Sequence, residues 1–308
     1  MNQKKIAGYA LAILLIMIGS LTALAQGNAI YDVIPNPLAG NYPSQPFQAA
    51  QAAELGDRAA FIIPGRALTT VTVTMSSWAC QTGHWTIGCV TAPGATFTHP
   101  ITLNLYNVGA GNSVGSLITS ITQTQTIPYR PTSDLIHCGD TRWYDAAANQ
   151  CYNGKAANVT FDFTSQHITL PNQVIVGIAY NTSNWGYSPI GPKPCDSTVE
   201  GCPYDSLNVA LVNPAITLTA GSNPSPADAY FNSQTPSNYC DNGAGGVGVF
   251  RLDSGCWTGF KPAVEINAGN PPVNKDDCKG NGWQTRTTAA GQSFPNQGQC
   301  IQYVNTGK

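Results

Sequence analysis

The residues from Thr70 to Met75 read Thr-Val-Thr-Val-Thr-Met, and this alternation of polar and apolar residues indicates the fold class. In an extended chain successive side chains point to opposite faces, so the two valines share a face with Met75 while the threonines share the other. β-branched residues at this density favour a strand. The stretch therefore predicts a β-strand with one face in a core and its threonine face toward solvent.

The same alternation recurs along the chain, at 101–105, 159–163, 174–178 and 207–211. Further strands are expected at 117–127, 215–219, 246–251 and 262–267. Clusters of Pro, Gly and Asn separate these segments, and no long segment keeps the apolar stripe of a helix. Strands without crossover helices pair antiparallel, so we expect an all-β fold in which residues 59–268 form a two-sheet, jelly-roll-like β-sandwich.

The first 25 residues have the features of an export signal. Lys4 and Lys5 precede an uncharged apolar run, Ile6 to Ile18, which is shorter than the roughly 20 residues that span a bilayer. Ala23-Leu24-Ala25 offers small residues to a signal peptidase, so cleavage before Gln26 is expected. The mature chain is thus predicted to be secreted, to the extracellular space or the cell surface, with no membrane segment after cleavage.

Residues 26–58 show no sustained alternation and are expected to be an irregular N-terminal segment. The alanine-rich stretch from Gln48 to Arg58 has the composition of a short helical turn that Gly56 would end.

The cysteines support export independently, because an even number in an exported chain predicts a disulfide framework. Taken in chain order they form five short loops, each between turn-rich flanks. Pairing between neighbours is therefore expected: Cys80 with Cys89, Cys138 with Cys151, Cys195 with Cys202, Cys240 with Cys256, and Cys278 with Cys300. Short loops restrict the unfolded chain less than long ones, so each bond is expected to stabilise by no more than about 3 kcal/mol.

Charge is sparse and slightly negative, with 10% of residues charged and a formal net charge of −2. Removing Lys4 and Lys5 with the signal leaves 12 basic against 16 acidic residues, or −4. Nucleic acids and anionic membranes require basic patches, so neither is an expected partner. A polar but uncharged surface suits a neutral partner such as a glycan, or other copies of the same chain.

The C-terminal residues 269–308 are expected to be a linker followed by a small two-cysteine module. Cys-Lys-x-x-Gly-Trp begins at Cys278, and Phe-x-Asn-Gln-Gly-Gln-Cys ends at Cys300. This pair of motifs resembles a short C-terminal module of exported bacterial proteins with no assigned activity. About 36 residues cannot build a core alone, so one disulfide and the rings of Trp283 and Phe294 are expected to hold it.

A looser resemblance covers residues 66–190. A threonine-rich strand, Gly115-Ser116-Leu117, and Val-Thr-Phe-Asp-Phe followed by Leu-Pro-Asn are similar to bacterial extracellular jelly-roll modules. Those modules are mostly ligand-binding or surface-display domains, so the resemblance implies a role in binding or in surface display.

Catalytic and metal signatures are weak. A glycosidase needs two carboxylates, and the pairs available are Asp140 with Asp145 and Glu200 with Asp205, all inside or beside disulfide loops. Cys80-x3-His84 with Cys89 superficially resembles zinc ligation, but a disulfide is favoured in an exported chain. Oxygen ligands for a structural calcium ion are present in the loops at Asp134, Asp140, Asp145, Asp196, Glu200, Asp205 and Asp241.

Aromatic residues in two long loops give the main functional signal. Loop 128–157 contains Trp143 and Tyr144, and loop 181–205 contains Asn184, Trp185 and Tyr187. Flat rings stack on sugar rings and neighbouring amides bond to hydroxyls, as a carbohydrate site requires. We therefore expect a non-enzymatic exported β-sandwich that binds a neutral glycan through these residues. Packing of the rings against their own disulfides is the structural alternative. A self-associating structural or surface-layer protein is the second functional reading, and a secreted glycan hydrolase or lyase the third.

Overall fold

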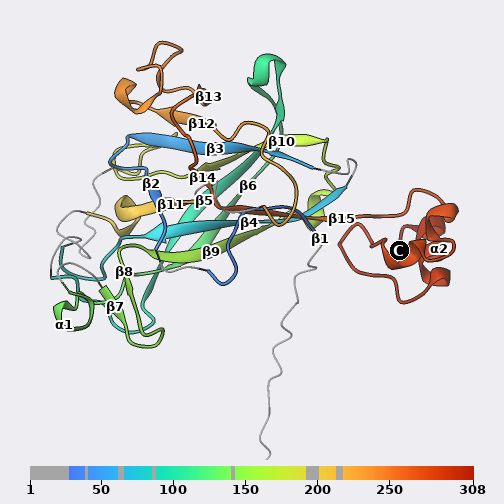
Figure 1. The fold of residues 1–308 in the computed structure, drawn as a ribbon, viewed down its shortest axis with the longest axis horizontal. Helices are drawn as coiled ribbons and strands as arrows, with labels where there is room; N and C mark the ends of the chain where they lie inside the picture. The colour runs from blue at the N-terminus through green and yellow to red at the C-terminus, as the bar shows by residue number, and fades with distance from the viewer. Residues whose placement is uncertain are drawn as a thin grey trace, which may run out of the picture.

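The computed structural model describes residues 28–38, 41–61, 66–84, 88–139, 143–191, 201–212 and 218–308. The predicted signal peptide and most of the strand expected at 215–219 lie outside these residues. Two antiparallel sheets pack against each other (Figure 1), which confirms the expected all-β sandwich. Within the described ranges, no helix is both long enough and apolar enough to cross a membrane.

The first sheet has seven strands arranged around β4. Residues 70–73 of β4 pair with β15 on one side and with β9 on the other. On the same side as β15, β11 pairs with residues 75–77 of β4. Its strands are β1 (Asn28–Asp32), β2 (Ser44–Pro46), β4 (Ala67–Ser77), β9 (Lys155–Asp162), β11 (Leu207–Val212), β14 (Lys261–Pro262) and β15 (Val264–Gly269).

The second sheet has six strands in the order β13-β12-β3-β10-β5-β6. They are β3 (Ala52–Ala60), β5 (Thr96–Val108), β6 (Val114–Pro128), β10 (Gln173–Ala179), β12 (Asp228–Ser233) and β13 (Arg251–Ser254). Four strands of each sheet, β1-β15-β4-β9 and β3-β10-β5-β6, have the strand order of a jelly roll. Strands β11 to β14 are an insertion between β10 and β15 of that plan.

The core lies between the sheets, where Val71, Val73, Leu103, Leu105 and Val176 are at most 2% exposed. The prediction that the threonines of β4 face solvent was wrong: they are buried as well. The reason is the neighbouring strand β9, whose polar side chains bond to them. Thr72 Oγ1 lies 2.9 Å from Thr160 Oγ1, and Thr74 Oγ1 donates to Asn158 Oδ1 at 2.7 Å.

The N-terminal segment 26–58 is part of the sandwich rather than irregular. β1 pairs with β15, and β3 lies between β10 and β12. The expected helical turn at 48–58 is therefore wrong, because burial of Leu55 and Ala59 in the core overrides the helix propensity of the alanines. The strand expected at 246–251 is also absent from this described stretch, since β13 begins only at Arg251.

Four of the predicted disulfides are present: Cys80–Cys89, Cys138–Cys151, Cys240–Cys256 and Cys278–Cys300. Cys195, the predicted partner of Cys202, lies outside the described residues. The Cys138–Cys151 bond ties helix α1 (Leu135–Cys138) to a small hairpin of β7 (Trp143–Asp145) and β8 (Gln150–Tyr152).

The C-terminal module follows β15 and extends beyond the end of the sandwich (Figure 1). Phe294 is buried beside the Cys278–Cys300 bond, and Trp283 packs against them, as the sequence predicted. Helix α2 (Gln297–Thr306) was not expected. It begins after Asn296, whose Oδ1 accepts from Gln299 N at 2.9 Å, and it ends at Gly307 in the left-handed region.

Candidate functional site

A cleft of about 340 Å³ lies where the start of β5 and the end of β6 meet the β7–β8 hairpin. Its lining includes three prolines, two tyrosines and an ion pair: Pro93, Pro128, Pro131, Tyr129, Tyr144, Asp145 and Lys155. The volume is near the lower end of the range for small-ligand pockets, roughly 300–1,000 Å³. Loop 128–157 thus forms a concave surface around Tyr144, one of the residues predicted to bind a ligand.

Tyr144 is held in a single orientation. The His137 ring stacks on it, with ring centroids 4.3 Å apart and planes 7° apart, and the Tyr144 hydroxyl donates to Asn149 Oδ1 at 2.9 Å. Asp134 fixes His137 in turn, because Asp134 Oδ2 lies 2.7 Å from His137 Nδ1. Tyr144 lines the cleft, whereas His137 does not. The ring is therefore a pre-positioned flat surface.

Asp145 and Lys155 supply charge and hydrogen-bonding groups beside that ring. Lys155 Nζ donates to Asp145 Oδ2 at 2.6 Å, and this bond is the main reason why the pKa of Asp145 is lowered. The backbone N–H of Ala147 donates to Asp145 Oδ1 at 3.0 Å. The carboxylate thus stays ionised at neutral pH, and the pair presents a donor and an acceptor to the cleft.

Trp143, the other predicted residue in this loop, points into the protein. It is 4% exposed and packs against the Cys80–Cys89 bond. The guanidinium of Arg130, itself fully buried, lies 3.3 Å from the centroid of the Trp143 ring and 5.5 Å from that of Trp78. Trp143 therefore has the packing role that the sequence left as the alternative, and it offers no open face to a ligand.

Of the second predicted loop, the described residues 181–191 lie against the outer face of the second sheet, where Tyr187 contacts Glu54. Asn184 is exposed and Trp185 is half-buried, while Tyr187 is 59% exposed. Thr182 closes the turn, since its N–H donates to Trp185 O at 2.8 Å and its Oγ1 accepts from Trp185 N at 3.1 Å. The Tyr187 hydroxyl donates to Glu54 Oε2, so it is already engaged within the protein.

Glu54 is the residue that sequence reasoning missed. It is fully buried on the outer face of β3, where Asn104 Nδ2 donates to Oε1 at 2.9 Å and the Tyr106 hydroxyl donates to Oε1 at 3.0 Å. Burial raises its pKa, and the hydrogen bonds from Tyr187, Asn104 and Tyr106 oppose that rise. Its sequence signal is the alternation of Glu54, Gly56 and Arg58 with Leu55 and Asp57, which the alanine-rich composition obscures.

Glycine at position 177 makes room for this carboxylate. A Cβ on Gly177 would lie 2.0 Å from Glu54 Oε1, and three donors hold Glu54 in place. We expect Gly177→Ala to lower the free energy of unfolding by about 2 kcal/mol, measured by urea denaturation. In a Glu54→Ala background the same substitution should be neutral or stabilising. An equal loss in both backgrounds would contradict the proposed contact.

The candidate catalytic and metal residues do not form a site among the described residues. Asp205 accepts from Ser183 N and Ser183 Oγ, each at 2.8 Å, while its suggested partner Glu200 lies outside the described residues, as does Asp140. Cys80 and Cys89 form a disulfide, which removes the suggested zinc thiolates.

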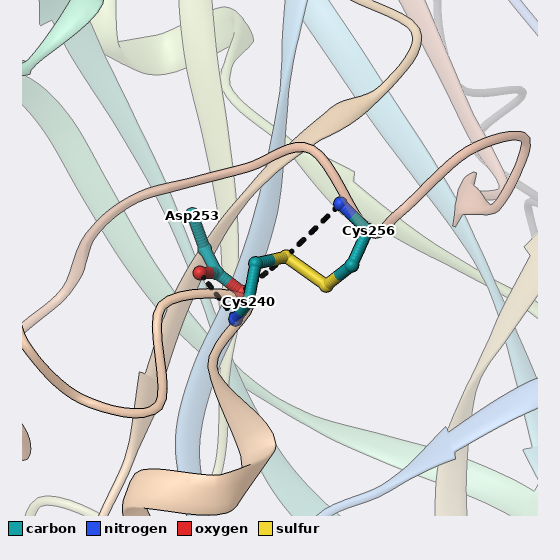
Figure 2. Close-up of side chains that lie close together, drawn as sticks. All are labelled: Cys240, Asp253 and Cys256. Atoms are coloured by element: carbon teal, nitrogen blue, oxygen red, sulfur yellow. Dashed lines mark hydrogen bonds between the residues drawn. A yellow bond between two sulfur atoms is a disulfide. The ribbon is translucent and has the colours of Figure 1, made fainter.

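Of the residues suggested for calcium, Asp196 also lies outside the described ranges, and Asp134, Asp145 and Asp241 contact local groups of their own. In the described part of the chain, one group of three potential metal ligands is close together: Cys240, Asp253 and Cys256. Figure 2 shows that the two sulfurs are bonded to each other. Asp253 accepts from Cys240 N at 2.9 Å and from Trp257 Nε1 at 2.7 Å, so the cluster braces a loop.

Comparisons with protein-family models, with curated proteins and with solved structures find no match to this chain. The resemblance of the C-terminal motifs and of residues 66–190 to exported bacterial modules therefore stays a prediction. Of the five residues predicted to bind a ligand, the geometry favours Tyr144, which combines a fixed ring, an adjacent ion pair and a cleft.

Proposed function

We propose that this protein is an exported, non-enzymatic β-sandwich that binds a neutral glycan in the cleft beside Tyr144. One observation carries the proposal: a tyrosine held by stacking against His137 lines a cleft that also contains the Asp145–Lys155 pair. An aromatic face contacts the C–H groups of a sugar ring, while a carboxylate and an ammonium group bond to its hydroxyls. The chain's low content of charged residues fits a neutral ligand.

Several features favour this cleft over the loop at 181–191. The hydroxyl of Tyr187 is bonded to Glu54, and Trp185 is half-buried. A ligand at Tyr187 would have to compete with an existing hydrogen bond to a buried carboxylate, whereas Tyr144 makes its bond to Asn149 at the side of an open cleft. The cost of displacing existing contacts is therefore lower at Tyr144.

The test is binding of mature protein, residues 26–308, to an array of neutral polysaccharides and oligosaccharides in the presence of calcium. Tyr144→Ala should weaken binding about tenfold or more, because it removes the stacking surface. Tyr144→Phe should keep most of the affinity, since it retains the ring and loses only the bond to Asn149. Melting temperatures of each variant show that the fold is intact.

Two further variants locate the site. Leu117→Ala removes a 53% exposed side chain from β6 and should leave binding unchanged. Tyr187→Ala tests the other loop. Loss of binding in Tyr187→Ala with Tyr144→Ala unaffected would place the site over Glu54 and refute the cleft, and the absence of any bound glycan would refute the proposed function.

A further inference from the structure

One edge of the second sheet has the longest stretch of regular pairing among the strand edges of the described chain. β6 is the last strand of its sheet and pairs only with β5 among the described strands. It is 15 residues long, Val114–Pro128, and it contains no charged side chain. In an antiparallel pair, alternate residues direct their N–H and C=O groups away from the partner strand. One side of β6 therefore presents a long row of backbone donors and acceptors.

Proteins ordinarily protect such edges with short strands, charges, prolines or bulges. The other outer strands described here all have such protection. β13 has four residues and contains Arg251 and Asp253, and β9 begins at Lys155 and ends at Asp162. β1 has five residues with a register shift, β2 ends in Pro46, and β14 consists of Lys261 and Pro262. β6 has register shifts near Leu117 and Val114 and a proline at Pro128, but residues 119–127 between them pair with β5 without a shift and have no charge or proline.

The chemistry of this edge specifies its partner. A row of unpaired backbone groups is satisfied along its length only by another extended strand. That partner strand needs an unprotected stretch of its own, and among the described outer strands residues 119–127 of β6 are the longest regular stretch without a charge or proline. We infer that β6 pairs antiparallel with β6 of a second copy, which joins the two six-stranded sheets into one continuous sheet across a two-fold axis.

The composition of β6 is compatible with pairing to itself. A two-fold axis brings identical residues near each other, so any charge on β6 would face its own copy. β6 has serine, threonine, glutamine, isoleucine and leucine side chains, which make no such repulsion. The formal net charge of −2 over 308 residues also keeps long-range repulsion between copies small.

Paired lysines placed on β6 test this interface. Thr122 and Thr124 are exposed and lie on one face of the sheet. If the regular stretches 119–127 overlap fully, Gln123 lies on the axis and Thr122 of one copy faces Thr124 of the other, with their Cβ atoms about 4.5–5.5 Å apart. Sedimentation velocity from micromolar to millimolar protein should show a dimer of the wild type. The Thr122→Lys/Thr124→Lys variant should dissociate about tenfold more readily or worse.

The matched control is Thr96→Lys/Thr98→Lys. Both threonines are exposed on the same face of β5, one strand further from the axis, and they add the same charge. This variant should dimerise as the wild type does. Hydrogen exchange gives a second readout, because alternate β6 amides should become protected as protein concentration rises. A wild type that is monomeric throughout, a dimer equally affected by both variants, or a dimer without new β6 protection would each overturn the inference.

Discussion

Arg130→Ala should lower the free energy of unfolding by about 4 kcal/mol. Arg130 is the largest fully buried side chain, and its guanidinium lies against the Trp143 ring while Nη1 donates to Asn153 O at 2.8 Å. Its backbone N–H bonds to Ala79 O, so the residue joins the end of β6 to three other segments. Truncation leaves a cavity between Trp78 and Trp143 and removes the donor to Asn153. Urea denaturation followed by tryptophan fluorescence measures the loss.

Arg130→Lys is the informative companion variant. Lysine keeps the charge but lacks the flat guanidinium that stacks on an indole, so we expect a loss of about half that of alanine. Arg286→Ala is the control, because its ion pair with Asp277 is part-exposed and should contribute no more than about 1 kcal/mol. If Arg130→Ala cost no more than Arg286→Ala, the cluster would not be a structural element and Trp143 would again be a candidate for ligand binding.

The second large effect is on the pH dependence of stability. Asp57 is buried in β3, where burial raises its pKa from its ordinary 3.8 to about 7. The backbone N–H of Arg58 and the charges of Lys261 and Arg58 oppose this rise only in part. Because the folded state holds the proton more tightly than the unfolded state, the contribution of Asp57 is fully present below about pH 4. It is lost as the pH rises to about 7, by up to about 4 kcal/mol.

The contribution of His99 to the free energy of unfolding changes with pH in the opposite direction from that of Asp57. The measurement therefore has to distinguish the two contributions. Burial lowers its pKa from its ordinary 6.5 to about 4, so its contribution is present above pH 6.5 and is lost as the pH falls toward 4. In the wild type, the two contributions therefore change the free energy of unfolding in opposite directions as the pH rises. Asp57→Asn should therefore be more stable than the wild type at pH 8, and its stability should fall more steeply than that of the wild type below pH 6.

The measurement is the difference between the unfolding free energies of wild type and Asp57→Asn from pH 4 to pH 8. The side chain of Asn223 donates to Asp57 Oδ2, so the new amide loses one hydrogen bond, at every pH alike. That loss changes the difference in unfolding free energy by the same amount at each pH, so the slope of the difference against pH stays the same. A difference that stays constant with pH would show that Asp57 titrates normally in the folded protein.

Much of the sandwich can be predicted from alternation, and particular residues show where that signal fails. Strands β4, β5, β9, β10 and β11 have large β-branched or aromatic residues on one face, and the sequence locates each of them. The alternation does not reveal β3, because alanine fills its core positions beside Leu55 and small side chains give little hydrophobic periodicity. The alternation does not predict β12 either. This strand has only six residues, and Tyr230 and Asn232 lie on its face away from the core.

The positions of the candidate binding residues were harder to predict than the fold. Trp143 and Tyr144 are adjacent in sequence, and in a strand adjacent side chains point to opposite sides. One of them had to face inward, and the buried Arg130 guanidinium fixes which. The local alternation around Glu54 does not reveal its partners, since Asn104 and Tyr187 are 50 and 133 residues away in sequence. Contacts over such distances depend on sheet order, which alternation does not reveal.

The short disulfide loops have a consequence for how the chain oxidises as it is made. In the described bonds the bonded cysteines are 9, 13, 16 and 22 residues apart, and in each bond the second cysteine is the next one along the chain after the first. The polypeptide is synthesised from the N-terminus toward the C-terminus. Cys80 and Cys89 are therefore both present before Cys138 has been made. The first available thiol is thus the correct one at each of these steps. We therefore expect thiol oxidation in chain order to form these four bonds without an isomerase to correct mispaired intermediates.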